Sequence, residues 1–325
     1  MKITAQAPSN IAFTKYWGKK GDPALKLPEN ASISMNLSGL TTVTTVEFDS
    51  KLKTDKVVIN GETEESPERV STHLDVIRKM AGIKTYARVV SKNNFPMGTG
   101  LSSSASSFAA LSLAGSKAAG LNLTEKELSI LARQGSGSAC RSIPNGFIEW
   151  LDGDTSDSSY AVSLHEEDYW NIRDVVAIVS SEPKKTSSTK GQESATSSPF
   201  YAKRLEGMKS KNNNLKKALE AKDFKAFGEI VESDALELHA IMLTSHPALI
   251  YWTTGTLKIM KLVSEWRSEG LSVYFTVNTG QDIHLIVQAK DVNKLEKKLQ
   301  SIKEVKTTIV NEPTQGARQL TEDLF

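Results

Sequence analysis

The stretch NFPMGTGLSSSASS, residues 94–107, places two glycines around a threonine and continues into a run of small hydroxyl residues. An alanine-rich apolar segment follows, which predicts a loop that opens a helix over about 102–119. Glycines let backbone N–H groups approach a ligand, and a helix N-terminus adds unpaired N–H groups and a positive dipole end. The stretch fits a polyphosphate cradle or a loop that only caps a buried helix. It is not the Walker pattern, because no Gly-Lys-Ser/Thr closes it.

The composition limits the function classes. The chain has 325 residues, 39% hydrophobic and 24% charged, with a net charge of +2, so nothing indicates a nucleic-acid or acidic membrane partner. No apolar run approaches about 18 residues, and the N-terminal residues lack the apolar core of a signal peptide. The single cysteine, Cys140, cannot form an intrachain disulfide, which favours a reducing, cytoplasmic setting. No Cys/His cluster has metal-ligand spacing.

Strands and helices are mixed along the chain, which predicts an α+β fold with a domain boundary that divides it into 1–185 and 186–325. The polar, hydroxyl-rich segment 182–199 is expected to be mobile. Thr124 and Glu127 are spaced as a capping box for one helix. Strands are expected at 41–48, 56–60, 85–91, 175–181, 273–277, 284–288 and 305–310, and further helices at about 67–81, 200–222, 223–243, 247–269 and 291–302.

A second stretch, PSNIAFTKYWGKKG at 8–21, places three lysines around an aromatic pair. Lys15 and Lys19 can hold an anionic substrate while Tyr16 and Trp17 wall the pocket. The alternative is a solvated basic face beside a core tryptophan.

A third stretch, GSGSACRSIPNGFIEW at 135–150, surrounds Arg141 with small residues. An arginine in such a turn can bind a carboxylate or phosphate through two parallel hydrogen bonds, or it can pair with an acid such as Glu149.

Taken together, these stretches resemble a known family. PMGTGLSSSAS is similar to the phosphate-binding motif of the GHMP kinase superfamily. In chain order, NIAFTKYWGKK, LPENASISMNLS, SGSACRSIPNGFIEW and KKTSSTKGQESATSSPF resemble the diphosphomevalonate decarboxylase family. The resemblance implies a two-domain GHMP kinase fold, with an N-terminal α+β domain and a C-terminal ferredoxin-like domain around a cleft. It also implies ATP and Mg²⁺ as cofactors, a homodimer, and phosphorylation of the 3-hydroxyl of 5-diphosphomevalonate followed by loss of phosphate and CO₂.

The resemblance also implies roles for residues. Lys15 corresponds to the catalytic lysine, and Arg141 would orient the substrate carboxylate. ATP would be bound by Pro96, Met97, Gly98, Thr99, Gly100, Leu101, Ser102, Ser103, Ser104 and Ser106. The substrate would be bound by Tyr16, Trp17, Gly18, Lys19, Arg69, Ser136, Gly137, Ser138, Ala139, Cys140, Ser188 and Thr189. Cys140 itself is expected to be a buried structural residue rather than a nucleophile.

One motif departs from the family. Where the family has Asp-Ala-Gly-Pro-Asn, this chain has NTGQD, so Asn278 stands in the place of the aspartate and Asp282 in that of the asparagine. An amide cannot accept a proton at neutral pH. We expect Asp282 to reach the same point across the turn, so that both residues belong to the catalytic set. Alternatively the base is dispensable, or the reaction is altered.

Other readings therefore stay open. They are a mevalonate 3-kinase-like enzyme without decarboxylation, a decarboxylase of mevalonate 3,5-bisphosphate or 5-phosphomevalonate, and a non-catalytic metabolite-binding homologue. The 5-monophosphate is included because Gln192 and Glu193 follow SSTKG, and an acid near a diphosphate would be unfavourable. The residues that hold the metal are not indicated.

Overall fold

The computed structural model describes residues 1–95, 100–180, 182 and 186–325. Its helices and strands are mixed, as the sequence predicts. The helices are α1 (Glu68–Ala81), α2 (Ser103–Ala118), α3 (Glu125–Gly135), α4 (Ser188–Glu193), α5 (Tyr201–Glu220), α6 (Phe224–Thr244), α7 (Thr254–Ser268) and α8 (Val292–Gln300). The strands are β1 (Lys2–Ala12), β2 (Lys19–Lys20), β3 (Leu27–Pro28), β4 (Ser32–Asp49), β5 (Lys56–Ile59), β6 (Glu62–Thr63), β7 (Tyr86–Asn93), β8 (Phe147–Trp150), β9 (Ala161–His165), β10 (Ile172–Ile178), β11 (Val273–Thr276), β12 (Ile283–Gln288), β13 (Thr307–Asn311) and β14 (Arg318–Leu320).

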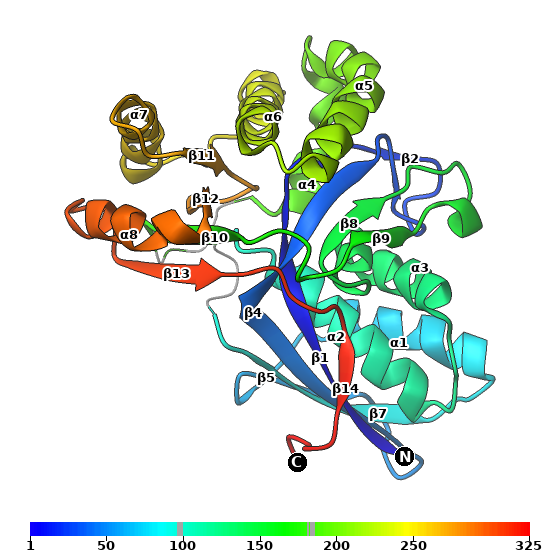
Figure 1. The fold of residues 1–325 in the computed structure, drawn as a ribbon. Helices are drawn as coiled ribbons and strands as arrows, with labels where there is room; N and C mark the ends of the chain where they lie inside the picture. Colours follow the sequence, from blue (N-terminus) through cyan, green and yellow to red (C-terminus); the bar gives the residue numbers. More distant parts are fainter. Residues whose placement is uncertain (96–99, 181, 183–185) are drawn as a thin grey trace.

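The first unit is a sheet with helices on one side (Figure 1). Its strand order is β14-β1-β4-β7-β5-β6, with β8 and β9 attached along β4. The pairs are antiparallel except for β5 and β7. Helices α1, α2 and α3 pack on this sheet, and α2 is buried on nearly every side because Ala, Ser and Gly let it lie close to its neighbours.

The second unit is a four-stranded antiparallel sheet of order β11-β12-β10-β13. Its inner side chains form an apolar core with α7 and α8. Helix α6 packs against β11, and α5 packs against α6. A separate two-stranded ribbon, β2 with β3, places Lys19 opposite Pro28 and Lys20 opposite Leu27.

The two units share one apolar core. Phe13 and Met35 of the first unit lie in the same buried cluster as Phe227, Tyr274 and Ile286 of the second. After the second unit the polypeptide returns to the first, where β14 pairs with β1 (Thr4 opposite Leu320). No helix among the described residues is long and apolar enough to cross a membrane.

The expected α+β fold is confirmed, and so is the capping box of Thr124 and Glu127. The boundary predicted at 185/186 does not coincide with the division of strands between the two sheets. Strand β10, before the boundary, belongs to the second sheet, and β14, after it, belongs to the first. The segment 182–199, expected to be mobile, contains α4, whose N-terminus is capped when the Ser187 hydroxyl accepts a hydrogen bond from the Lys190 N–H.

Candidate active site

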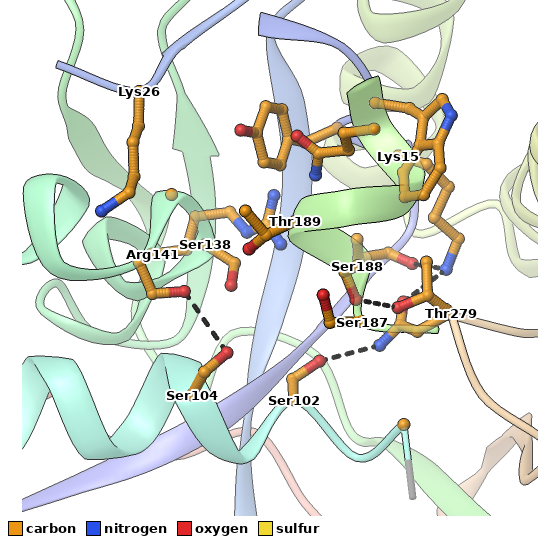
Figure 2. Close-up of a pocket in the computed structure, with 18 of the residues that line it drawn as sticks. Lys15, Lys26, Ser102, Ser104, Ser138, Arg141, Ser187, Ser188, Thr189 and Thr279 are labelled. Carbon is orange, nitrogen blue, oxygen red and sulfur yellow. Dashed lines mark hydrogen bonds between the residues drawn. The ribbon is translucent and has the colours of Figure 1, made fainter. Parts of the chain in front are cut away.

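A polar cavity of about 440 Å³ lies where the two units meet. The first unit contributes the segment after β1, the β2–β3 ribbon, the start of α1, the N-terminus of α2, the end of α3 and the 3₁₀ helix η1 (Gly137–Ser142). The second unit contributes α4, Leu238 of α6 and the segment after β11. The segments that the sequence analysis selected separately therefore line one cavity (Figure 2).

Lys15 and Asn278 meet inside this cavity. The Lys15 ammonium donates to the side-chain oxygen of Asn278 at 3.0 Å and to the Ala12 carbonyl at 2.6 Å. The Asn278 amide nitrogen donates to the Ser102 hydroxyl at 3.2 Å. The amide thus connects the lysine to the start of α2. Both acceptors of the ammonium are neutral.

The backbone of Lys15 is fixed by a buried ion-pair network. Its N–H donates to the Asp234 carboxylate at 2.7 Å, and its carbonyl accepts from Asn30 at 3.0 Å and from Arg204 at 3.3 Å. Arg204 and Lys211 also pair with Asp234. Burial alone would raise the pKa of Asp234, but these cations and hydrogen bonds hold it below its usual value. Asp234 therefore stays ionised and holds the lysine in place.

Lys15 itself is only 2% exposed. Burial lowers the pKa of its ammonium to about 7, with the positive charges of Arg141 and Arg204 acting in the same direction and Asp234 and Asp174 opposing them. His239 lies behind the pair, because its ring contacts the Asn278 carbonyl at 3.1 Å. Burial lowers the pKa of His239 to about 3, so this ring is neutral at physiological pH.

Arg141 is buried and held at two of its nitrogens. Its Nε donates to Asn10 at 3.1 Å and its Nη1 donates to the Ser32 hydroxyl at 2.7 Å. Its Nη2 donates to none of the described residues, and the guanidinium lies over the Trp150 ring at 5.8 Å. The predicted alternative, a pair with Glu149, is not formed, because Glu149 pairs with Lys216. Arg141 is therefore an oriented cation without a described anionic partner.

The N-terminus of α2 opens toward the cavity. No side chain of the described residues caps this helix. The Ala105 N–H donates to the Ser102 carbonyl at 2.8 Å, and the N–H groups of Ser103 and Ser104 remain available to an anion. Ser102, Ser103 and Ser104 line the cavity beside them. Gly100 has φ +111°, and a Cβ there would lie 2.4 Å from the Gly280 Cα, so only glycine allows this close approach of the two units.

Three cations gather at another end of the cavity. Lys19, Lys26 and Arg69 all line it, and none forms an ion pair within the described part of the chain. The Lys26 ammonium donates to the carbonyls of Gln134 and Gly135. Figure 2 places Lys26 and Lys15 far apart across the view.

Two aromatic residues and several small residues complete the walls of the cavity. Tyr16, Trp17, Ser136, Gly137, Ser138, Ser188 and Thr189 line it as expected. Gln192 also faces the cavity, whereas Glu193, the acid that raised doubt about a diphosphate, is exposed.

Asp282 does not lie in this cavity. Its Oδ1 accepts from the backbone N–H groups of Val179 at 2.9 Å and Ser180 at 3.4 Å, after the end of β10. Its Oδ2 is buried and contacts no described hydrogen-bond donor. Burial raises the pKa of this carboxyl above its usual value, against the two backbone hydrogen bonds. The turn therefore brings Asn278 to Lys15 and directs Asp282 elsewhere, contrary to the expectation that the acid reaches the same point.

Some other expected residues also do not line the cavity. Leu101 lies in the apolar core, and the Ser106 hydroxyl bonds to Thr42. Gly18, Ala139 and Cys140 are buried and do not line the cavity, and burial raises the pKa of the Cys140 thiol to about 12, which agrees with a structural thiol. Pro96, Met97, Gly98 and Thr99 lie outside the described residues.

Several residues that line the cavity were not predicted from the sequence. They are Ala12, Lys26, Gly135, Ser187, Gln192, Leu238 and Thr279. An adjoining, mostly apolar hollow of about 270 Å³ was also missed; Val57, Ile59, Val89, Phe108 and Leu111 line it. The hollow shares Arg69, Ser103 and Ser104 with the polar cavity.

This chain is similar to known proteins over most of its length. Residues 7–161 match the family model "Diphosphomevalonate decarboxylase-like N-terminal domain", and residues 174–323 match "Mevalonate 5-diphosphate decarboxylase C-terminal domain". A diphosphomevalonate decarboxylase of Candida albicans is 37% identical over 84% of this chain and 81% of its own.

Solved structures agree as well. The mevalonate diphosphate decarboxylase of Staphylococcus aureus superposes with a TM-score of 0.93 at 36% identity over 98% of each chain. A structure described as "MDDEF in complex with MVAPP, AMPPCP and Magnesium" superposes with a TM-score of 0.92 at 34% identity, over 98% of this chain and 99% of that chain.

Proposed function

The chain belongs to the diphosphomevalonate decarboxylase family, and we propose that it converts 5-diphosphomevalonate and ATP to isopentenyl diphosphate, ADP, phosphate and CO₂. It is an ATP-dependent carboxy-lyase of the mevalonate pathway in the GHMP kinase superfamily. The observation that carries the assignment is the single cavity that brings Lys15, Arg141 and the uncapped N-terminus of α2 together.

ATP fits the first-unit side of the cavity. The free N–H groups of α2 and the hydroxyls of Ser103 and Ser104 suit its phosphates, and the adjoining apolar hollow suits its base. Mg²⁺ fits the same place, because it prefers oxygen ligands. Serine hydroxyls and phosphate oxygens can supply these ligands. The described residues contain no group of three or more His, Cys, Asp or Glu that could hold it alone. Bound there, Mg²⁺ would neutralise phosphate charge.

The substrate carboxylate fits Arg141. Asn10 and Ser32 fix the guanidinium, which leaves Nη2 for a strong charge-assisted hydrogen bond. Lys19 and the hydroxyls of Ser136, Ser138 and Ser188 suit the phosphorylated tail.

We assign to Lys15 the role of accepting the proton of the 3-hydroxyl. Asn278 cannot accept one, Asp282 lies elsewhere, and Lys15 has a low pKa and neutral partners. In the first step the hydroxyl oxygen attacks the γ-phosphorus of ATP, the bond to ADP breaks, and the proton moves to Lys15 Nζ. The resulting ammonium then lies beside the new 3-phosphate.

The second step uses that charge. The bond between the carboxyl carbon and its neighbour breaks and CO₂ departs. The released electron pair forms the new double bond as the C3–O bond to phosphate breaks. The Lys15 ammonium stabilises the leaving phosphate, and Arg141 keeps the carboxylate aligned until it leaves.

Phosphorus NMR of the purified protein with ATP, Mg²⁺ and 5-diphosphomevalonate tests the proposal. ADP, free phosphate and isopentenyl diphosphate should appear in equal amounts. ADP with a persistent 3-phosphorylated product would instead mean a 3-kinase, in which Asn278 cannot support elimination. Absence of ADP would contradict both readings.

We also infer a cytoplasmic homodimer. The single cysteine is buried and free, which suits a reducing compartment. Leu236, Leu243, Ile250 and Leu257 are exposed apolar residues on α6, α7 and the loop between them, and they offer a surface for a second copy. Sedimentation of the wild type and of Leu243→Asp tests this; we expect a dimer that the substitution weakens.

A further inference from the structure

The ion-pair network behind Lys15 combines two carboxylates with two cations. Arg204 of α5 pairs with Asp234 of α6 through both of its terminal nitrogens, at 2.9 and 3.1 Å. Lys211, also on α5, donates to Asp234 at 3.1 Å, and both cations pair with Glu237 as well. The side chains of Arg204 and Asp234 are buried, so water screens their charges little. The four charges of the network cancel.

This network holds the backbone of Lys15 from the second unit. Asp234 accepts the Lys15 N–H at 2.7 Å, and Arg204 donates to the Lys15 carbonyl at 3.3 Å. The lysine follows β1 of the first unit, whereas α5 and α6 belong to the second. Two helices of one unit therefore fix the backbone of a lysine that belongs to the other.

A carboxylate beside Lys15 is unfavourable for a lysine that must lose its proton. Burial lowers the pKa of Lys15, whereas the charge of Asp234 raises it. The charge of Arg204 lowers this pKa, so the anchor and its counter-ion have opposite effects on the same amine. The other ionisable groups that surround the lysine come from three elements; they are Arg141 of η1, Asp174 of β10 and the neutral His239 of α6.

We propose that Arg204, with Lys211, is a charge-balancing positioning residue of Lys15: Asp234 anchors the backbone of the lysine, and the two cations cancel the carboxylate charge so that the amine can serve as a base. The inference rests on the proposed function, in which Lys15 accepts a proton, and adds residues that touch no reacting atom. Because the anchor and its counter-ions all belong to the second unit, contact between the units sets both the position and the proton affinity of the lysine.

The test compares variants that change the charge of the pair in opposite directions. Arg204→Met removes a cation, Asp234→Asn removes the anion but keeps an acceptor oxygen, and a double variant removes both charges. Lys203→Met is the matched control, because Lys203 neighbours Arg204 on α5 but pairs with Glu206 where both side chains are exposed.

Two measurements are made on these variants. Carbon-13 NMR of the protein labelled at the lysine ε-carbons measures the pKa of Lys15 without ATP or substrate, and Lys15→Arg assigns the signal. The pH profile of kcat/KM for 5-diphosphomevalonate then shows whether the acid limb follows the pKa of the lysine.

Arg204→Met should raise the pKa of Lys15 by roughly 1 unit, and Asp234→Asn should lower it by roughly 1 unit. The acid limb of kcat/KM should move in the same directions. The double variant should return close to the wild-type limb, because both charges leave together. Arg204→Lys keeps the charge and should keep the limb although kcat falls, and Lys203→Met should match the wild type.

Shifts of the same sign in Arg204→Met and Asp234→Asn would overturn the proposal, as would a shift in Lys203→Met as large as in Arg204→Met. A lower melting temperature in both variants with an unchanged Lys15 pKa would also overturn it, because a purely structural ion pair gives that result.

Removal of one partner of a buried ion pair is strongly destabilising. If the single variants do not fold, Lys211→Met replaces them, because the Lys211 side chain is 15% exposed. This variant should move the acid limb to higher pH by less than Arg204→Met, and an unmoved limb would contradict the charge balance.

These outcomes are separate from those of the proposed function. The expected pKa shifts in a protein that forms no ADP would contradict the reaction and leave the charge balance intact. Full turnover with a Lys15 pKa that none of the variants changes would contradict the charge balance alone.

Discussion

The Lys15 ammonium donates to the side-chain oxygen of Asn278 at 3.0 Å, so a neutral amide stands where a carboxylate would form an ion pair. This difference of one group controls the charge state of the lysine. A carboxylate would stabilise the ammonium, whereas an amide leaves burial as the dominant effect on its pKa. In the mechanism that we propose, the amide at position 278 therefore lets Lys15 act as the base.

The first prediction concerns pH. The pKa of Lys15 is lowered to about 7, so the free amine is scarce below that pH and abundant above it, and kcat/KM should rise with pH through about 7. Asn278→Asp should pair with the ammonium and raise the Lys15 pKa by roughly 1–3 units. The acid limb should then move to higher pH, with activity at pH 7 reduced about 5-fold or more. A limb that instead moves well below pH 6 would show that the new carboxylate accepts the proton.

Lys15→Arg is the companion variant. Arginine keeps the positive charge but cannot release its proton, so kcat should fall by roughly 10²–10⁴. The KM for ATP should stay within a few-fold. Retention of more than about a tenth of the wild-type kcat would mean that charge alone suffices at this position.

The second prediction concerns Asp282. Removal of its carboxylate leaves the N–H groups of Val179 and Ser180 without their acceptor, so Asp282→Ala should reduce the free energy of unfolding by about 1–3 kcal/mol. The kcat per folded molecule should remain within a few-fold of wild type. Asp282→Asn keeps an acceptor oxygen and should stay close to wild type in both respects. Loss of activity in both variants at normal stability would mean that Asp282 takes part in catalysis.

The third prediction concerns Arg141. Glutamine removes the charge that we assign to the substrate carboxylate, so the substrate KM should rise roughly 10- to 100-fold in Arg141→Gln. The CO₂ released per ADP should also fall below one, since alignment of the departing carboxylate is lost. Arg141→Lys keeps a charge without the planar fork and should be intermediate. An unchanged ratio of CO₂ to ADP in Arg141→Gln would contradict the role of Arg141 in aligning the departing carboxylate.

The fourth prediction concerns Gly100. A Cβ at this position would meet the Gly280 Cα at 2.4 Å, and φ is +111°, so Gly100→Ala must separate the loop from the turn after β11. The KM for ATP should rise at least about 10-fold. Gly61→Ala is the control, because Gly61 has φ +89° with open space around it and therefore tests the backbone conformation alone. Similar ATP binding in Gly100→Ala and wild type would mean that the contact is not needed.

Local patterns in the sequence predicted much of the fold. Regular apolar spacing and caps such as Thr124 located the helices well. Strand β1 was not predicted, since Pro8 and several polar residues interrupt its alternation and pairing with β4 maintains it. Strand β14 has no local signal either, because only its distant partner defines it. Helix α4 was missed although Ser187 offered an N-cap, because the surrounding hydroxyl residues indicated a loop.

In the candidate site, too, local sequence patterns did not predict the positions that depend on distant partners. Motif order placed Lys15, Arg141 and Asn278 in one cavity, and the structure brings them together. The position of Asp282 could not be predicted, since four residues across a turn fix neither the direction of a side chain nor its backbone partners. Lys26 could not be predicted because its place depends on the ribbon of β2 and β3 and on the end of α3.

The pairing of β14 with β1 has a consequence for how the chain matures. The residues of β1 leave the ribosome before their edge partner, which follows more than three hundred residues later. At about 5–20 residues per second, this edge stays open for roughly 15–60 s during synthesis. The edge of the first sheet thus lacks its last strand while the intervening chain is made, and a nascent chain stalled before β14 exposes this edge to neighbouring chains and to chaperones.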